Sequence, residues 1–164
     1  MNPDGKQRIY FDTTIPNFLF AKERPDRMAA TWRLWEKCRV GEYEICLSPI
    51  FFLELHKCPE PKLTKMLEEL DKILFSRLQT SDEAVELAAE YTRKAAFGVK
   101  SLNDSRHVAY AVVNGCDAVL SWNFHQTRPW TRNIIKEVNL LHRYESIEIL
   151  QPDEFLDGGR NDSR

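Results

Sequence analysis

The chain has 164 residues, enough for one domain with a buried core. A hydrophobic fraction of 43% and a charged fraction of 29% are ordinary for a globular domain and exclude a fibrous or disordered chain. No apolar run approaches the roughly 20 residues of a membrane span, and the N-terminus lacks the apolar centre of a signal peptide, so we expect a cytoplasmic protein without membrane contact. The formal net charge of −2 excludes nucleic-acid binding through bulk positive charge.

In the first half of the chain, short β-prone runs alternate with helical patterns. Pro25 opens one predicted helix, and Gly41 ends it. Ser48 is a suitable N-cap, and Pro49 suits the first helical position, where its missing N–H costs nothing. The patterns predict strands over 8–11, 43–47 and 74–78, and helices over 25–40, 50–56 and 63–74.

The second half continues the same alternation. Ser81 is predicted to cap one helix, Asn103 to cap the next, and Gly115 to end that second helix. The patterns predict helices over 82–97, 104–114 and 134–141, and strands over 117–121 and 147–150. We therefore predict one domain over 8–152, with flexible tails over 1–7 and 157–164.

Strands that alternate with helices indicate a single α/β domain with a parallel sheet. Sites in such sheets form beyond the carboxyl ends of the strands. Asp12 ends the first predicted strand, Glu54 lies in the helix after the second, and Asp104 begins a later helix. Because carboxylates about 4 Å apart repel by roughly 4 kcal/mol at an effective dielectric near 20, converging acids favour a bound cation. Mg²⁺ prefers such oxygen ligands.

Several segments together resemble one known family. They are Ile9 to Pro16 (IYFDTTIP), Glu54, Asn103 to Ala109 (NDSRHVA) and Asp117 to Phe124 (DAVLSWNF). In this order they resemble PIN domains, most closely the VapC-like toxin ribonucleases of type II toxin–antitoxin systems. The resemblance extends from about Arg8 to about Pro152.

The resemblance implies a three-layer α/β/α sandwich around a central, mostly parallel sheet. It also implies RNA cleavage that depends on Mg²⁺ or Mn²⁺ and uses a metal-activated water. By position, Asp12, Glu54 and Asp104 match the acidic metal ligands of the family. Thr14 matches a small hydroxyl residue that helps to place the metal or a phosphate, and Asn123 falls where many members have a fourth Asp.

Asn123 is a departure from that pattern, because an amide oxygen can coordinate but carries no negative charge. We expect weaker metal affinity, or one firmly held metal rather than two, and tighter Mg²⁺ binding in Asn123→Asp. A degenerate domain that binds RNA or a protein without cleavage is the alternative. A DNA nuclease stays open, whereas Thr14 argues against a haloacid-type phosphatase, which needs an Asp at that position.

Arginines are the candidate substrate contacts. Arg106, Arg128 and Arg132 can each bind backbone phosphate, or can belong to a solvated helix face. The family resemblance implies an RNA substrate, a small antitoxin as partner and a homodimer.

Some residues near these motifs have other predicted roles. His107 can face the site or stack in the core, and a structural or supporting role is favoured. Trp122 can stack on an unpaired base, although packing is favoured. Trp32 and Trp35 are expected in the core or on an apolar face shared with another subunit. Asp117 is expected at the sheet end away from the site. The four cysteines show no CxxC spacing and are predicted to be buried thiols.

Overall fold

A computed structural model describes residues 4–94, 102–123 and 127–158. Five strands form one sheet in the order β3-β2-β1-β4-β5, and every neighbouring pair is parallel. The strands are β1 (Arg8–Phe11), β2 (Glu44–Leu47), β3 (Phe75–Arg77), β4 (Ala118–Leu120) and β5 (Glu148–Leu150). The predicted parallel sheet is therefore confirmed.

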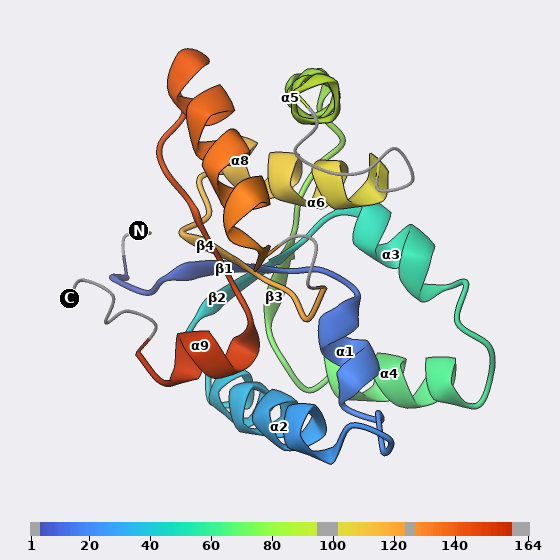
Figure 1. The fold of residues 1–164 in the computed structure, drawn as a ribbon. Coiled ribbons are helices and arrows are strands. Elements are labelled where there is room, and N and C mark those ends of the chain that lie inside the picture. Colours follow the sequence, from blue (N-terminus) through green and yellow to red (C-terminus); the bar gives the residue numbers. More distant parts are fainter. Residues whose placement is uncertain (1–3, 95–101, 124–126, 159–164) are drawn as a thin grey trace.

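Helices cover both faces of this sheet (Figure 1). One layer contains α5 (Asp82–Arg93), α6 (Leu102–Val113) and α8 (Pro129–Leu141). The opposite layer contains α1 (Thr14–Phe18), α2 (Pro25–Arg39), α4 (Lys62–Leu70) and α9 (Pro152–Leu156), while α3 (Pro49–Leu55) lies beside the end of the sheet. This arrangement confirms the predicted three-layer α/β/α sandwich.

The central strand divides its side chains between two cores. Ile9 and Phe11 pack with the α2 side chains, whereas Tyr10 packs with α5 and α6. All three are fully buried, as expected for a parallel strand covered on both faces. Trp35 and Trp122 belong to the α2-side core, and Trp32 packs against it, so the predicted packing role of these tryptophans is confirmed.

The predicted helix signals act locally as expected. The Ser48 hydroxyl accepts a hydrogen bond from the backbone N–H of Phe51 at 3.3 Å, and Ser81 does the same for Ala84 at 3.1 Å. Both satisfy a donor that has no partner within the helix. Gly115 follows α6 with a φ of +71°, a conformation that suits glycine after a helix.

The structure differs from the predictions at several helix ends. α1 and α9 were not predicted, and α8 begins at Pro129 rather than near 134. α6 begins at Leu102, so Asn103 lies inside the helix and is not its N-cap. The helix predicted over 82–97 is observed as α5 to Arg93; residues 95–97 lie outside the described part.

The predicted tails lie partly outside the described residues, at 1–3 and 159–164. Within the predicted C-terminal tail, Asp157 pairs with Arg33 at 3.5 Å. Over the described ranges, the chain has no helix with the length and apolarity needed to span a membrane.

Candidate active site

The strand order reverses its direction at β1. The chain moves from β1 to β2 and β3 in one direction, and then places β4 and β5 on the other side of β1. Loops that leave neighbouring strands in opposite directions open a crevice at the carboxyl ends of the strands, here called the carboxyl edge. Asp12 directly follows β1, and Ser121 directly follows β4, so the two meet at this switch point.

Asp12 is a buried carboxylate held by hydroxyl groups. Its Oδ1 accepts hydrogen bonds from the Thr14 backbone N–H at 2.9 Å and the Thr14 hydroxyl at 2.5 Å. Its Oδ2 accepts one from the Ser121 hydroxyl at 2.5 Å. Burial raises the pKa of Asp12 above its usual value, although the charge of His107 and these hydrogen bonds act in the opposite direction. A nearby cation would therefore relieve the cost of keeping Asp12 ionised.

Glu54 is held more completely, by three side chains from two separate segments. Its Oε1 accepts from the Thr13 hydroxyl at 2.8 Å and lies 2.7 Å from His107 Nε2. Its Oε2 accepts from Asn103 Nδ2 at 2.8 Å. Burial acts to raise the pKa of Glu54, but His107 and the other donors outweigh it and lower the pKa to about 2. Glu54 is therefore an anion at neutral pH.

His107 links Glu54 to the start of the helix that carries it. The imidazole is 1% exposed, and its Nδ1 lies 2.6 Å from the Tyr10 hydroxyl. That hydroxyl lies 2.6 Å from the Ser48 hydroxyl, which caps α3. Because the ionised Glu54 can only accept, His107 Nε2 is the donor between them. The predicted supporting role of His107 thus has a definite geometry: it fixes Glu54 from behind.

Asp104 and Asn123 form the remaining part of the site. Asn123 Nδ2 donates to Asp104 Oδ2 at 3.1 Å. The Asn123 backbone N–H donates to the Ser121 hydroxyl at 2.9 Å, and the same hydroxyl donates to Asp12. One hydrogen-bonded series therefore runs from Asp104 through Asn123 and Ser121 to Asp12. Asn123 therefore joins Asp104 to the residues that hold Asp12, although it carries no charge.

The oxygen atoms of Asp12 and Asp104 suit a hard cation only together with the amide oxygen of Asn123. Among the residues that the structure describes, no three His, Cys, Asp or Glu side chains gather as a metal-binding group. The two carboxylates of Asp12 and Asp104, with the neighbouring Asn123 amide, are oxygen donors of the kind Mg²⁺ takes together with water and phosphate. Glu54 uses three of its roughly four acceptor positions within the protein, which leaves mainly Oε2 for a ligand role.

The predicted substrate arginines are spread out. Arg106 is half-buried on α6. Arg128 donates from Nε to the Thr131 hydroxyl at 3.2 Å, at the start of α8. Arg132 pairs with Glu154 at 3.2 Å, so its charge is already engaged with α9.

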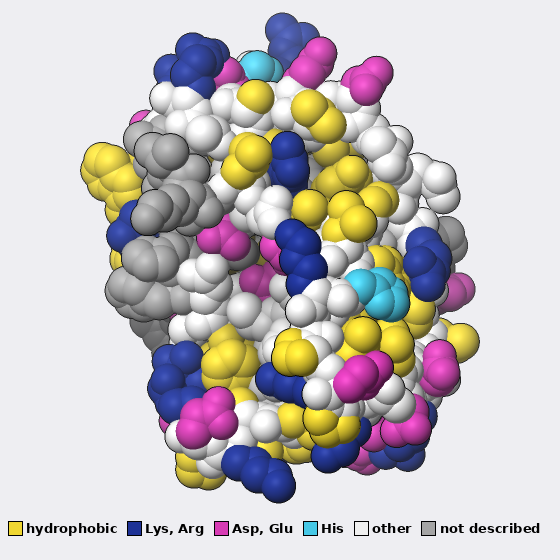
Figure 2. Space-filling model, turned by 90° about the vertical axis from the view of Figure 1, so that its right-hand side faces the viewer, with side chains coloured by type: hydrophobic (Ala, Val, Ile, Leu, Met, Phe, Trp, Pro, Cys, Tyr) yellow, Lys and Arg dark blue, Asp and Glu magenta, His cyan; other side chains and the backbone are white. Residues whose placement is uncertain are grey.

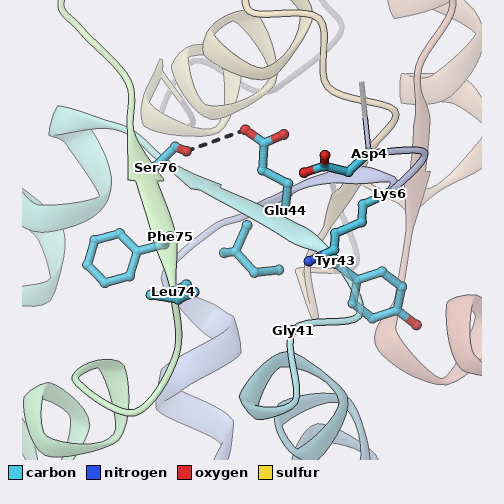
Figure 3. Close-up of a pocket in the computed structure, with 9 residues that line it drawn as sticks. Asp4, Lys6, Gly41, Tyr43, Glu44, Leu74, Phe75 and Ser76 are labelled. Carbon is cyan, nitrogen blue, oxygen red and sulfur yellow. Dashed lines mark hydrogen bonds between the residues drawn. The ribbon is translucent and has the colours of Figure 1, made fainter. Parts of the chain in front are cut away.

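The opposite edge of the sheet, where the strands begin, is its amino edge. There Asp117 accepts a hydrogen bond from the Arg8 backbone N–H at 2.8 Å, away from the site as predicted. Figure 3 shows a cavity of about 390 Å³ at the same edge, between the starts of β2 and β3. Glu44 lines it and accepts a hydrogen bond from Ser76 at 3.4 Å. None of the predicted site residues lines this cavity.

Figure 2 looks onto the side of the molecule that carries α1, α3 and α4. Asp and Glu side chains gather near the centre of this face, with Lys and Arg side chains beside them. We call these Lys and Arg side chains the rim of the site. Their positive charge can counter the repulsion that acidic side chains exert on a polyanion.

The sequence patterns did not predict that three side chains hold the carboxylates: Thr13, Ser121 and Asn103. Thr13 adjoins Asp12, and Ser121 is two residues before Asn123. A hydroxyl residue at the end of a strand, next to a candidate ligand, was an available signal for the first two. Asn103 was noticed, but its side chain binds Glu54 instead of capping the helix.

The comparisons with known proteins address the fold. No family model matches the chain, and no curated protein sequence does. The structure is similar to a chain in the crystal structure of VapBC2 from Rickettsia felis bound to a DNA fragment from their promoter. The TM-score is 0.54 at 13% sequence identity, over 88% of this chain and 98% of that chain. At this identity the likeness establishes a shared α/β fold.

Proposed function

We propose that this protein is a metal-dependent endoribonuclease of the VapC-like type, acting as the toxin of a toxin–antitoxin pair. The observation that carries the proposal is the series Asp104–Asn123–Ser121–Asp12 at the switch point of a parallel sheet. Similarity of the fold to a chain of VapBC2 supports it, as do the PIN-like sequence segments. A small antitoxin and a second copy of the chain are the partners that follow from this assignment.

In this proposal, Asp12, Asp104 and Asn123 hold Mg²⁺ or Mn²⁺, and Glu54 contributes through Oε2, directly or through a water. The bound cation would supply a Lewis acid and an activated water for in-line attack on a phosphodiester. Thr14 and Ser121 keep both oxygens of Asp12 in fixed positions. His107 and Thr13 hold Glu54 as an anion. The chain thus prepares an anionic, oxygen-rich site beside the rim where RNA would lie.

The test is cleavage of a mixed single-stranded RNA pool with Mg²⁺, Mn²⁺ or EDTA, by the wild type and by Asp12→Asn. We expect cleavage with either metal, none with EDTA, and none by a folded Asp12→Asn. Glu44→Gln is the matched control, because it also neutralises a carboxylate near a strand end but lies at the amino edge. Equal cleavage by wild type and Asp12→Asn would contradict the proposal.

A domain that binds RNA without cutting is the second candidate. Two observations favour it: Asn123 supplies no charge, and Glu54 is tied to three protein donors. The cleavage assay, together with a measurement of RNA binding, separates the two functions. RNA binding by a folded wild type that cuts with neither metal would support the second candidate over the first.

A further inference from the structure

We propose that Arg27 binds a backbone phosphate of single-stranded RNA at the rim of the active site; this inference rests on the proposed function and extends it. Arg27 lies in the first turn of α2, and its guanidinium lies over two aromatic rings. Its Cζ is 5.2 Å from the ring centroid of Trp122 and 5.9 Å from that of Phe18. Both distances are within cation–π range.

Both rings belong to the segments that carry the site. Phe18 ends α1, the helix that begins at Thr14, and Trp122 directly precedes Asn123. The Trp122 backbone N–H donates to the Thr14 hydroxyl at 2.9 Å, and that hydroxyl donates to Asp12. The surface beneath Arg27 is therefore continuous with the residues that hold Asp12.

The Trp122 ring beneath the guanidinium is held by hydrogen bonds to α2. Trp122 Nε1 donates to the Thr31 hydroxyl at 2.9 Å, and Thr31 lies one helical turn after Arg27. The Thr31 hydroxyl in turn donates to the Arg27 carbonyl at 2.6 Å. This arrangement fixes the ring of Trp122, which is 4% exposed, under the guanidinium of Arg27. A cation that is held in advance loses less entropy when it binds a ligand.

The edges of the guanidinium suit a phosphate. Among the described residues, no carboxylate lies within ion-pair distance of Arg27, whereas Arg33 and Arg39 on the same helix pair with Asp157 and Glu36. The planar guanidinium carries a fork of N–H donors, the geometry for two parallel bonds to a phosphate. A bound phosphate would give the Arg27 guanidinium a negatively charged partner, which the two uncharged rings cannot be.

The experiment compares Arg27→Gln, Arg27→Lys and Arg33→Gln with the wild type. Binding of a fluorescein-labelled single-stranded RNA 12-mer is followed by anisotropy over a range of KCl concentrations, in the Asp12→Asn background. Cleavage of the same RNA is followed with Mg²⁺ in proteins that keep the wild-type Asp12. Arg33→Gln is the matched control, since it removes an arginine from the same helix but from an exposed ion pair.

We expect Arg27→Gln to weaken RNA binding and raise KM about tenfold, with kcat within about twofold of the wild type. The slope of log affinity against log salt should fall by about 0.7, the value for one phosphate contact on a single strand. Arg27→Lys should lose less RNA affinity than Arg27→Gln, because lysine keeps the positive charge but lacks the planar pair of N–H donors. A packing role alone would not change the salt slope.

The outcomes separate this inference from the proposed function. Cleavage by the wild type, with Arg27→Gln equal to Arg33→Gln in affinity and salt slope, would overturn the role of Arg27 and leave the nuclease standing. A wild type that does not cut, together with a reduced salt slope in Arg27→Gln, would overturn the nuclease and retain the phosphate contact. If Arg27→Gln unfolds, the affinity of Arg27→Lys decides: a lysine variant that binds the RNA as tightly as the wild type overturns the bidentate contact.

Discussion

The two edges of the sheet treat their acidic side chains differently. At the amino edge, Glu44 pairs with Arg8 at 2.6 Å, and Asp117 accepts from the Arg8 backbone. At the carboxyl edge, Asp12 and Glu54 are held by hydroxyl, amide and imidazole groups. An ion pair with arginine neutralises a carboxylate inside the fold, whereas hydroxyl and amide donors orient a carboxylate and leave its charge in place. The difference separates structural acids from acids available to a cation.

The largest expected effect comes from neutralising an acid at the carboxyl edge. Asp104→Asn keeps the shape of the side chain but removes the charge beside Asn123. Because loss of a supporting group alone typically costs 10- to 100-fold in metal affinity or activity, we expect a loss of at least about 100-fold in cleavage rate at fixed Mg²⁺. The rate is measured on single-stranded RNA, with circular dichroism to confirm folding. Activity within threefold of the wild type would remove Asp104 from the site.

Adding a charge at the same edge should have a smaller effect of opposite sign. Asn123→Asp places a carboxylate next to Asp104, and we expect Mg²⁺ affinity to rise about tenfold by calorimetry. The same change should lower the free energy of unfolding in EDTA by about 1 kcal/mol, because the two carboxylates then repel each other. Unchanged or weaker Mg²⁺ binding would place Asn123 outside the set of ligands.

Acid should reveal how Glu54 is held. Its folded-state pKa of about 2 lies below the usual 4.5, so ionised Glu54 stabilises the fold above about pH 4.5, and this contribution is lost as pH falls towards 2. Glu54→Gln should be less stable than the wild type by about 1 kcal/mol at pH 7, a figure discounted for partial exposure, and the gap should narrow by pH 3. Urea unfolding in EDTA measures both. If the free energy of unfolding changed with pH in the same way for both proteins, the lowered pKa of Glu54 would be contradicted.

The smallest effect should come from the amino edge. Glu44→Gln removes the ion pair with Arg8, whose two side chains are 22% and 24% exposed. We expect a loss of no more than about 1 kcal/mol in the free energy of unfolding and no change in cleavage rate. Thermal unfolding and the RNA assay check the two parts. A large loss of activity in a folded Glu44→Gln would break the distinction between the edges.

The sequence predicted the sheet because its signals are local. Ser48, Ser81 and Gly115 act within a few residues of themselves, and the buried strands are short apolar runs. α1 was missed because its five residues, with Pro16 in the middle, show no helical periodicity. Pro129 was an available signal for the start of α8, since proline suits the first helical position.

The way the site is held could not be predicted in the same manner. Tyr10 and His107 are 97 residues apart, and Glu54 and Asn103 are 49 apart. Such partners are determined by strand order and helix packing, which no local pattern encodes. The residue types of the site were therefore predictable from sequence, whereas the choice between a capping role and a Glu54 contact at Asn103 depended on the tertiary structure.

The central place of β1 has a consequence for synthesis of the protein. β1 is made first, but one of its two neighbours is β4, more than 100 residues later in the chain. Contacts so distant in sequence form slowly, and a growing chain cannot form them until the later strand leaves the ribosome. A nascent chain that ends before Ser121 lacks a donor to Asp12 and the whole of the Asn123–Asp104 contact. The candidate site is therefore completed only after β4 and the residues that directly follow it have been made.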